Sequence, residues 1–506
     1  MALRLVTMMV EGKMGSMNSV TTHSPVNRPF RRLQRWAVFF IALIGALLAM
    51  RYGWDGLADH RIAELERRAH AMGQPLLLSD FTPEVISDAD NAAVPIGQAL
   101  TMYAAKPSSR NRVIPSFTSD EDAPIAEADL PAISSCINPY QAERNLVRSA
   151  RACPQMVWNR PLISPIYRQL LPQASASYSV SEILLLAAED AYARSDDGEM
   201  LEDIRDLLLL QKAIDCYYPV PVTHMVAMGI GGRATVAVRR SAMNLQISDD
   251  AKSGATPRQV KALIADLLDE SAMQKNGTRA FFGEAAMILD AAPYETAWLH
   301  PAPVTWLFEP MYKADAQRKA AINIANAQSF QKVTWPAVHA ELKSETVPDA
   351  SLLESFAHPM FRSISYDPGR WPTLHFQHLA ERRIAAVMLA LRLYQHDHAD
   401  ALPRSLTELA PQYLPAVPAD PFDPSGKAFR YLPLHDPPIL YSVGENGADD
   451  GGSEKPMPGK RLKSYLTSNR WLERDAVFSL KPVSRLLQAQ DHQGQVSGGK
   501  GQEAEK

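Results

Sequence analysis

Four histidines in one stretch of the chain have a spacing at which metal ligands are often found. They are His375, His378, His396 and His398. His375, His378 and Glu381 fall at positions i, i+3 and i+6, near one face of an expected helix, and could bind a transition metal. His378 and His396 could not share an ion, because their separation corresponds to roughly 27 Å along a straight helix.

The linear motifs of catalysis are absent from this sequence. It contains no His-Glu-x-x-His metal motif and no Gly-x-Ser-x-Gly nucleophile elbow. We therefore expect the four histidines to be surface or helix-end residues, and we predict no catalytic residue. A catalytic cleft assembled from distant positions is the alternative that one sequence leaves open.

An acidic, glycine-rich loop, GENGADDGG at 444–452, is the second candidate site. Glu445, Asn446, Asp449 and Asp450 supply side-chain oxygens, and the four glycines allow the backbone to turn its carbonyl groups inward. Calcium takes about six to eight such oxygens in a flexible loop. The EF-hand spacing is absent, so two interpretations stay open: a calcium site and a solvated acidic turn.

The chain has three cysteines, Cys136, Cys153 and Cys216. Cys136 and Cys153 lie in a loop-rich stretch and could form a disulfide in an oxidising compartment. Cys216 would then be left over. The alternative is that Cys136 and Cys153 are two buried free thiols.

Three further patterns resemble ligand sites, but for each we expect a structural role. The sequence GIGGR at 229–233 lacks the Lys-Ser or Lys-Thr of a phosphate loop, so its glycines predict close helix packing. An acidic run predicts a solvated helix end rather than a cation site, and two arginines are expected at the surface. The acidic residues are Glu189, Asp190, Asp196, Asp197 and Glu199, and the arginines are Arg239 and Arg240.

An apolar segment near the N-terminus predicts a membrane anchor. Residues 36–50 carry no charge, and Arg51 can extend its side chain so that the span continues to residue 54. Trp36 and Trp54 would lie at the two interfaces. The arginines that precede the span, Arg28, Arg31, Arg32 and Arg35, predict a cytoplasmic N-terminus. A cleaved signal peptide is the alternative.

Helical periodicity dominates the region from about residue 90 to 345. The clearest helix start is Thr256 as N-cap with Pro257 at the first helical position. A further helix leaves the membrane at 57–72, and another long one begins near residue 372. The expected helices of the middle region are 180–195, 198–215, 222–246, 257–273, 277–291 and 313–330.

The last part of the chain resembles the C-terminal half of the major pseudopilin of type II secretion. A long helix is followed by a short helical turn at 404–410, strand-like pieces at 428–434 and 439–443, and the acidic loop. The positions that match the family pattern are Tyr394, Leu402, Pro403, Leu406, Leu409, Asp420, Pro421, Tyr431, Tyr441, Ser442, Gly444, Asn446 and Gly447. The resemblance implies a small α+β module and calcium binding by the final loop. Pilus incorporation is not implied, because a pseudopilin has its membrane helix directly before this module.

We therefore expect a mainly α protein with an N-terminal signal-anchor helix, an α-helical periplasmic domain and a small α+β pseudopilin-like module. The expected parts are a cytoplasmic segment 1–35, a transmembrane helix 36–54, a linker 55–89, a helical domain 90–370, the module 371–480 and a disordered tail 481–506. The whole order resembles a group of bacterial single-pass membrane proteins.

The expected role is that of an inner-membrane protein which acts as an envelope scaffold or interaction protein. The alternative is an envelope hydrolase or metal-dependent enzyme. Its expected partners are the lipid bilayer, through residues 36–54, and an envelope protein. The net charge of −4 and the lack of a basic stripe exclude a typical nucleic-acid binder. A deep pocket with converging titratable groups would favour the enzyme, and a flat apolar patch would favour the scaffold.

Overall fold

The computed structural model describes residues 28–82, 84–106, 125–168, 171–249, 254–299, 302–342, 370–458 and 469–487. The chain divides after Leu57 into two compact units. Most of the tail expected to be disordered, and residues 1–27 of the cytoplasmic segment, lie outside the described residues.

Helix α2 (Arg28–Ala71) begins in the first unit and ends in the second. Its apolar segment is long and hydrophobic enough to cross a membrane, which fits either a membrane anchor or a signal sequence. Trp36 and Trp54 both expose their side chains. The helix expected to leave the membrane at residues 57–72 belongs to the same continuous helix as the apolar segment.

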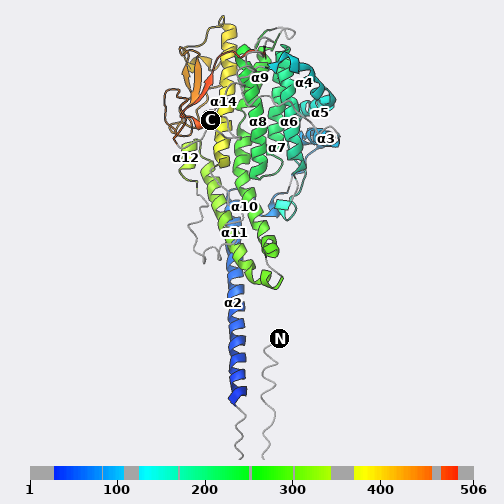
Figure 1. Ribbon diagram of the computed structural model, residues 1–506, viewed down its shortest axis with the longest axis vertical. Coiled ribbons are helices and arrows are strands. Elements are labelled where there is room, and N and C mark those ends of the chain that lie inside the picture. Colours follow the sequence, from blue (N-terminus) through cyan, green and yellow to red (C-terminus); the bar gives the residue numbers. More distant parts are fainter. Residues whose placement is uncertain are drawn as a thin grey trace, which may run out of the picture. The chain divides into compact units, whose positions relative to one another are not determined.

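The second unit is a helical body (Figure 1). Its main helices were expected from the sequence. Half of the expected ends lie within two residues of the observed ones, and the other half differ by five to eleven residues. Helix α9 begins as predicted: the Thr256 hydroxyl accepts from the Gln259 amide, and the helix buries Val260, Leu263 and Ile264. The helices are α3 (Ala93–Ala105), α4 (Leu130–Ile137), α5 (Gln141–Ser149), α6 (Pro172–Ala193), α7 (Asp197–Asp215), α8 (Pro221–Ser241), α9 (Pro257–Leu268), α10 (Ser271–Leu299), α11 (Ala302–Phe330), α12 (Trp335–His339) and α14 (Arg370–Asp397).

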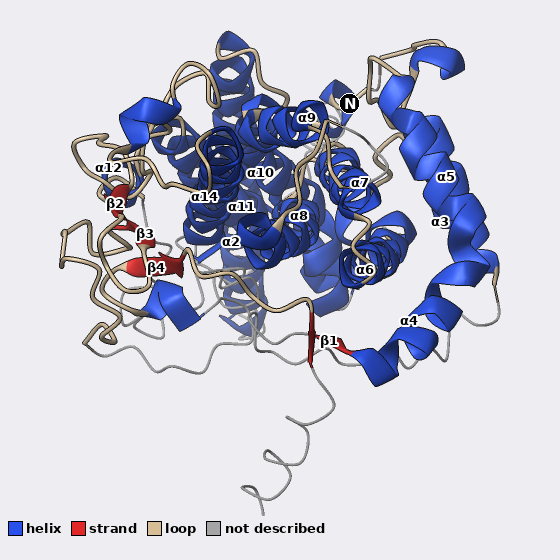
Figure 2. Ribbon diagram, turned by 90° about the horizontal axis from the view of Figure 1, so that it is seen from above, coloured by secondary structure: helices blue, strands red, loops and turns tan. Residues whose placement is uncertain are grey.

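Helix α14 lies between other elements of the body, as the view from above shows (Figure 2). It packs against α8 and α9 on one side, and the small sheet lies on another. Residues 384–391 of this helix are all buried. A helix that is apolar on every side needs such a position, because no face of it is suited to water.

The sheet is antiparallel with the strand order β2-β3-β4. Strands β2 (Arg430–Leu432) and β3 (Ile439–Ser442) form the expected hairpin, and β4 (Ala476–Ser479) adds a third strand that was not expected. The predicted helical turn is the 3₁₀ helix η10 (Leu406–Leu409). The prediction of a mainly helical protein with a small sheet is thus confirmed.

One apolar core joins the helical domain to the C-terminal module. Leu201 of α7, Leu389 of α14 and Phe478 of β4 belong to the same buried cluster. The boundary expected at residue 371 therefore does not separate two cores.

The start of the predicted disordered tail is also ordered. Leu486–Leu487 forms β5, which pairs in parallel with β1 (Ile125–Ala126).

A candidate site at the buried histidines

The structure places His375 and His378 in the interior, so the prediction that they are surface residues is wrong. Both project from the enclosed α14 and are almost completely buried. His396 and His398 follow the prediction, because they lie exposed near the end of the same helix. Glu381 does not join the two buried histidines: its carboxylate accepts from the Trp471 indole at 2.9 Å.

The buried histidines form part of a hydrogen-bonded chain that joins four helices. Oδ1 of Asp215, at the end of α7, lies 2.6 Å from Nδ1 of His224 in α8. Nε2 of His224 lies 3.0 Å from Nδ1 of His375, and Nε2 of His375 lies 3.2 Å from Oε1 of Gln274 in α10. No local pattern in the sequence indicates this chain, because its members come from positions up to about 160 residues apart.

The hydrogen-bond pattern assigns the donor and acceptor roles of Gln274 and His375 in this chain. The Gln274 amide nitrogen donates to the Phe330 carbonyl, so its Oε1 must accept from Nε2 of His375. Burial, and next the neighbouring His224, lower the pKa of His375 well below its ordinary value. A neutral His375 then accepts at Nδ1 from Nε2 of His224. The other ring nitrogen of His224, Nδ1, is hydrogen-bonded to Asp215.

His378 lies beside this chain and is held by Gln211 of α7. Gln211 accepts at Oε1 from Arg382 at 2.9 Å, so its amide nitrogen donates to Nε2 of His378, also at 2.9 Å. The proton of neutral His378 is therefore on Nδ1, which is buried without a hydrogen-bond partner among the described residues. A buried, unsatisfied donor costs about 1–3 kcal/mol.

A cavity of about 230 Å³ adjoins the histidines. Gln211 and Asp215 belong to its wall and also contact His378 and His224, so they connect the cavity to the buried chain. Charged groups of both signs converge on it, which the sequence could not show. The cavity is lined by Arg151, Cys153, Arg205, Leu208, Leu209, Gln211, Lys212, Asp215, Asp266, Asp269, Ala272, Met273 and Arg382.

Arg382 closes one side of this cavity. Its guanidinium donates to the carbonyl oxygens of Asp266, Leu267 and Asp269, at 2.8, 3.0 and 3.1 Å. These groups lie at the C-terminal end of α9, where carbonyl groups lack helical partners and a cation is favourable. Arg382 therefore fixes the end of α9 and the orientation of Gln211 together.

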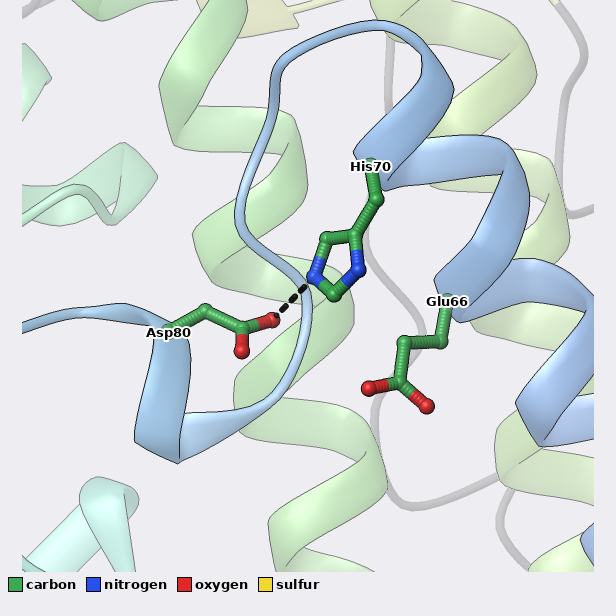
Figure 3. Close-up of side chains that lie close together, drawn as sticks. All are labelled: Glu66, His70 and Asp80. Carbon is green, nitrogen blue, oxygen red and sulfur yellow. Dashed lines mark hydrogen bonds and ion pairs between the residues drawn. The ribbon is translucent and has the colours of Figure 1, made fainter.

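A second cluster, formed by Glu66, His70 and Asp80, is the one group in the described residues that could hold a metal ion (Figure 3). Glu66 and His70 are one turn apart on α2, and Nε2 of His70 lies 2.9 Å from Oδ2 of Asp80. That oxygen also accepts from the backbone amides of Leu76 and Leu77. Asp80 thus closes the turn between α2 and the 3₁₀ helix η1 (Leu78–Asp80), a role that needs no metal.

Two residues of the acidic run do not lie at a solvated helix end, which corrects the prediction. Glu189 is buried and pairs with Arg240 at 2.9 Å, so Arg240 is not a surface residue either. Asp197 is fully buried and pairs with Arg485 at 2.6 Å. These acids are therefore neutralised by arginines of distant segments.

Two more members of the run pair with arginines, whereas Asp196 lies exposed at a helix end as predicted. Asp190 pairs with Arg194, and Glu199 pairs with Arg148. Asp196 caps α7 by accepting from the Glu199 amide. Arg239 is largely buried and lies 3.5 Å from Glu381.

The acidic loop has the predicted backbone form: glycines 444, 447, 451 and 452 all have positive φ. Its carboxylates have protein partners. Arg430 donates to Asp449 at 2.8 Å and lowers the pKa of that carboxyl, and Arg474 pairs with Asp450 at 3.1 Å. Glu445 accepts from Gln377, and Asn446 donates to Asp450. Two arginines thus already neutralise the carboxylates of Asp449 and Asp450.

Asp475 organises the same loop and was missed in the sequence. It is fully buried and accepts from the backbone amides of Asp450, Gly452 and Ser453. It lies outside the loop, just before β4, so local spacing could not identify it.

All three cysteines are half-buried free thiols in the structure, and the Cys136–Cys153 disulfide stays a prediction for an oxidising compartment. Cys136 packs on a small cluster around Ile133 and Ile137, whereas Cys153 packs against the main core.

Comparisons with known proteins add no identification to this geometry, since no family model, no curated protein and no solved structure matches the chain.

Proposed function

We propose that the protein is anchored in a bacterial inner membrane by residues 36–54, with a cytoplasmic N-terminus and a periplasmic body. Two observations support this proposal: the apolar segment of α2 and the four arginines that precede it. The bilayer is then the first partner of the chain.

The proposed function of the body is acid–base hydrolysis of a small polar ligand in the cavity beside Asp215. One observation carries this proposal: a carboxylate in the cavity wall is hydrogen-bonded to a buried imidazole at 2.6 Å. Paired titratable groups in a cleft are candidates for general acid–base catalysis. Asp215 would give the proton to the leaving group of the ligand, and the pair would regain one from the attacking water.

The charges around the cavity indicate the class of ligand. Arg151 and Lys212 carry positive charge, and Asp266 and Asp269 carry negative charge. Arg151 pairs with Glu202, Lys212 with Asp269 and Asp266 with Arg205, so a ligand would have to exchange with these ion pairs. A ligand that carries both signs, such as a short peptide, would find partners for both. The cavity is small, so only one or two residues of such a peptide would fit inside.

The test uses the full-length protein in nanodiscs with panels of short peptides, esters and phosphate esters. Asp215→Asn should lower turnover by about 10²–10⁴-fold, the usual contribution of a general acid–base group. Ala272→Trp should fill the cavity and abolish ligand binding, whereas Ala265→Trp, on the exposed side of α9, should not. Turnover that Asp215→Asn leaves intact, or no turnover by the wild type on any panel, would reject the proposal.

A scaffold role is the second candidate, and the edge of the sheet favours it. Within the described part of the chain, β2 pairs with β3 alone. Leu432 and Leu434 are exposed beside this edge, Leu434 almost completely. An envelope protein could add a strand here, and the resemblance to a pseudopilin module points to the same end of the chain. A photo-crosslinker at position 434 that captures one defined envelope protein would support this role, and labelling of lipid or solvent alone would count against it.

A further inference from the structure

We propose that the end of the α10–α11 hairpin inserts into the interface of the membrane that anchors the chain. This inference rests on the proposed anchor but not on the proposed hydrolysis. It assigns to the body a second contact with lipid, made by residues that the sequence analysis did not single out.

Two contacts give the direction of α11 relative to residues 59–72, at the C-terminal end of α2. Nζ of Lys313 lies 3.4 Å from Oδ1 of Asp59, and the amide nitrogen of Gln328 lies 3.2 Å from Sδ of Met72. Residue numbers rise together along both segments, so α11 runs alongside residues 59–72 in the same direction. The N-terminal end of α11 therefore points in the direction that runs from Met72 back to Asp59.

The lengths of these segments limit how far that end can lie from the proposed bilayer. Asp59 follows Trp54, the last residue of the proposed span, by five residues, which cover at most about 18 Å even when extended. Trp306 precedes Lys313 by seven residues, which correspond to roughly 10 Å of helix. A helix of this direction and length would reach from the level of Asp59 toward the membrane surface.

The chemistry of the hairpin end suits a bilayer interface. Residues 296–308, TAWLHPAPVTWLF, contain no Lys, Arg, Asp or Glu. Tyr294 on α10 and Trp306 on α11 leave 36% and 40% of their surface exposed. Aromatic residues of this kind concentrate at membrane–water interfaces, because one part of the ring system is apolar and another forms hydrogen bonds.

The α10–α11 hairpin also has an apolar cluster that is separate from the main core. Its two arms are held together by a separate apolar cluster of Ile288, Ala292, Tyr312 and Ala316. In the sequence, Glu295 directly precedes this uncharged segment and Glu309 directly follows it. The apolar end is therefore bounded by charged residues, as expected for a segment of limited depth in the interface.

Spin labelling of the full-length chain in nanodiscs tests the insertion. The three native cysteines are replaced by serine, and a label is attached at Trp306→Cys or, as the control, at Val333→Cys. Val333 is 77% exposed and follows the other end of α11. The label at 306 should be reached by oxygen in preference to a water-soluble nickel complex, and the label at 333 should show the reverse.

The outcomes separate this inference from the anchor itself. Labels at both positions that favour the nickel complex, in protein that still enters nanodiscs, would overturn the insertion and leave the anchor intact. A label at 306 shielded from both reagents would indicate a protein contact and would also overturn it. If the cysteine-free chain fails to fold, tryptophan fluorescence of the wild type provides the test. Brominated lipids should quench a larger share of the tryptophan emission in the wild type than in Trp306→Phe. An equal share in both proteins would reject the insertion.

Discussion

His378 and Gly231 are packed so closely that a side chain at position 231 has no room. A Cβ atom there would lie 2.6 Å from Nε2 of His378 and nearer still to Oε1 of Gln211. The GIGGR segment is thus part of α8, and its glycine allows α7 and α14 to approach that helix. The predicted role in close helix packing is confirmed.

Gly231→Ala should therefore destabilise the protein by about 1–3 kcal/mol, the usual cost of overpacking a core. The neighbouring Gly232 provides the control, because a Cβ atom there meets nothing within 4 Å. Gly232→Ala should be neutral or should stabilise the helix by about 0.5–1 kcal/mol. Denaturant unfolding of both variants measures the difference, and equal stability of the two would contradict the packing.

Stability should fall as the pH drops below about 6.5. Burial, followed by neighbouring charges, lowers the pKa of both His375 and His378 well below the ordinary value. Between the lowered pKa and 6.5, the unfolded chain binds protons that the folded chain does not bind, so acid favours unfolding. Each histidine should contribute up to about 1.4 kcal/mol per pH unit, and its contribution should be constant above pH 6.5.

His378→Gln should reduce this pH dependence, and His396→Gln, at an exposed position, should leave it unchanged. The measurement is the free energy of unfolding between pH 5 and 7.5. A wild-type protein whose stability is flat across this range would show that the two histidines are not kept neutral.

Local patterns in the sequence predicted the features that depend on neighbouring residues. Thr256 and Pro257 begin α9 as expected, and the loop glycines adopt the expected positive φ, because caps and turns are decided within a few residues. The pairing of Asp197 with Arg485 could not be predicted, since its partners are 288 residues apart. The burial of His375 was missed for a similar reason: the periodicity of α14 does not say which helices surround it.

The topology predicts the outcome of enzyme fusions. With the body in the periplasm, alkaline phosphatase joined after residue 60 or after residue 470 should be active, because the enzyme folds only in an oxidising compartment. Replacement of Arg28, Arg31, Arg32 and Arg35 by glutamine should lower that activity, since the charge bias sets the orientation. Inactive fusions at both positions would place the body in the cytoplasm.

The acidic loop should respond to calcium most clearly when its arginine is removed. Arg430 pairs with both Asp423 and Asp449, at 2.7 and 2.8 Å, and so occupies the position that a cation would take. Arg430→Ala should lower the melting temperature in EDTA, because two carboxylates lose their partner. Millimolar calcium should restore part of the loss, since the resemblance to pseudopilins predicts that this loop binds the ion.

The full chain has to be used for this measurement, because residues 371–480 share their core with the helical body. A site filled at about 100 times its dissociation constant would stabilise the fold by about 2.7 kcal/mol. Asp449→Ala with Asp450→Ala, added to Arg430→Ala, should abolish the recovery. The contrary outcome is that each protein, the wild type and Arg430→Ala, melts at the same temperature in calcium as in EDTA. The loop would then not bind calcium, and arginine would be the only cation that it requires.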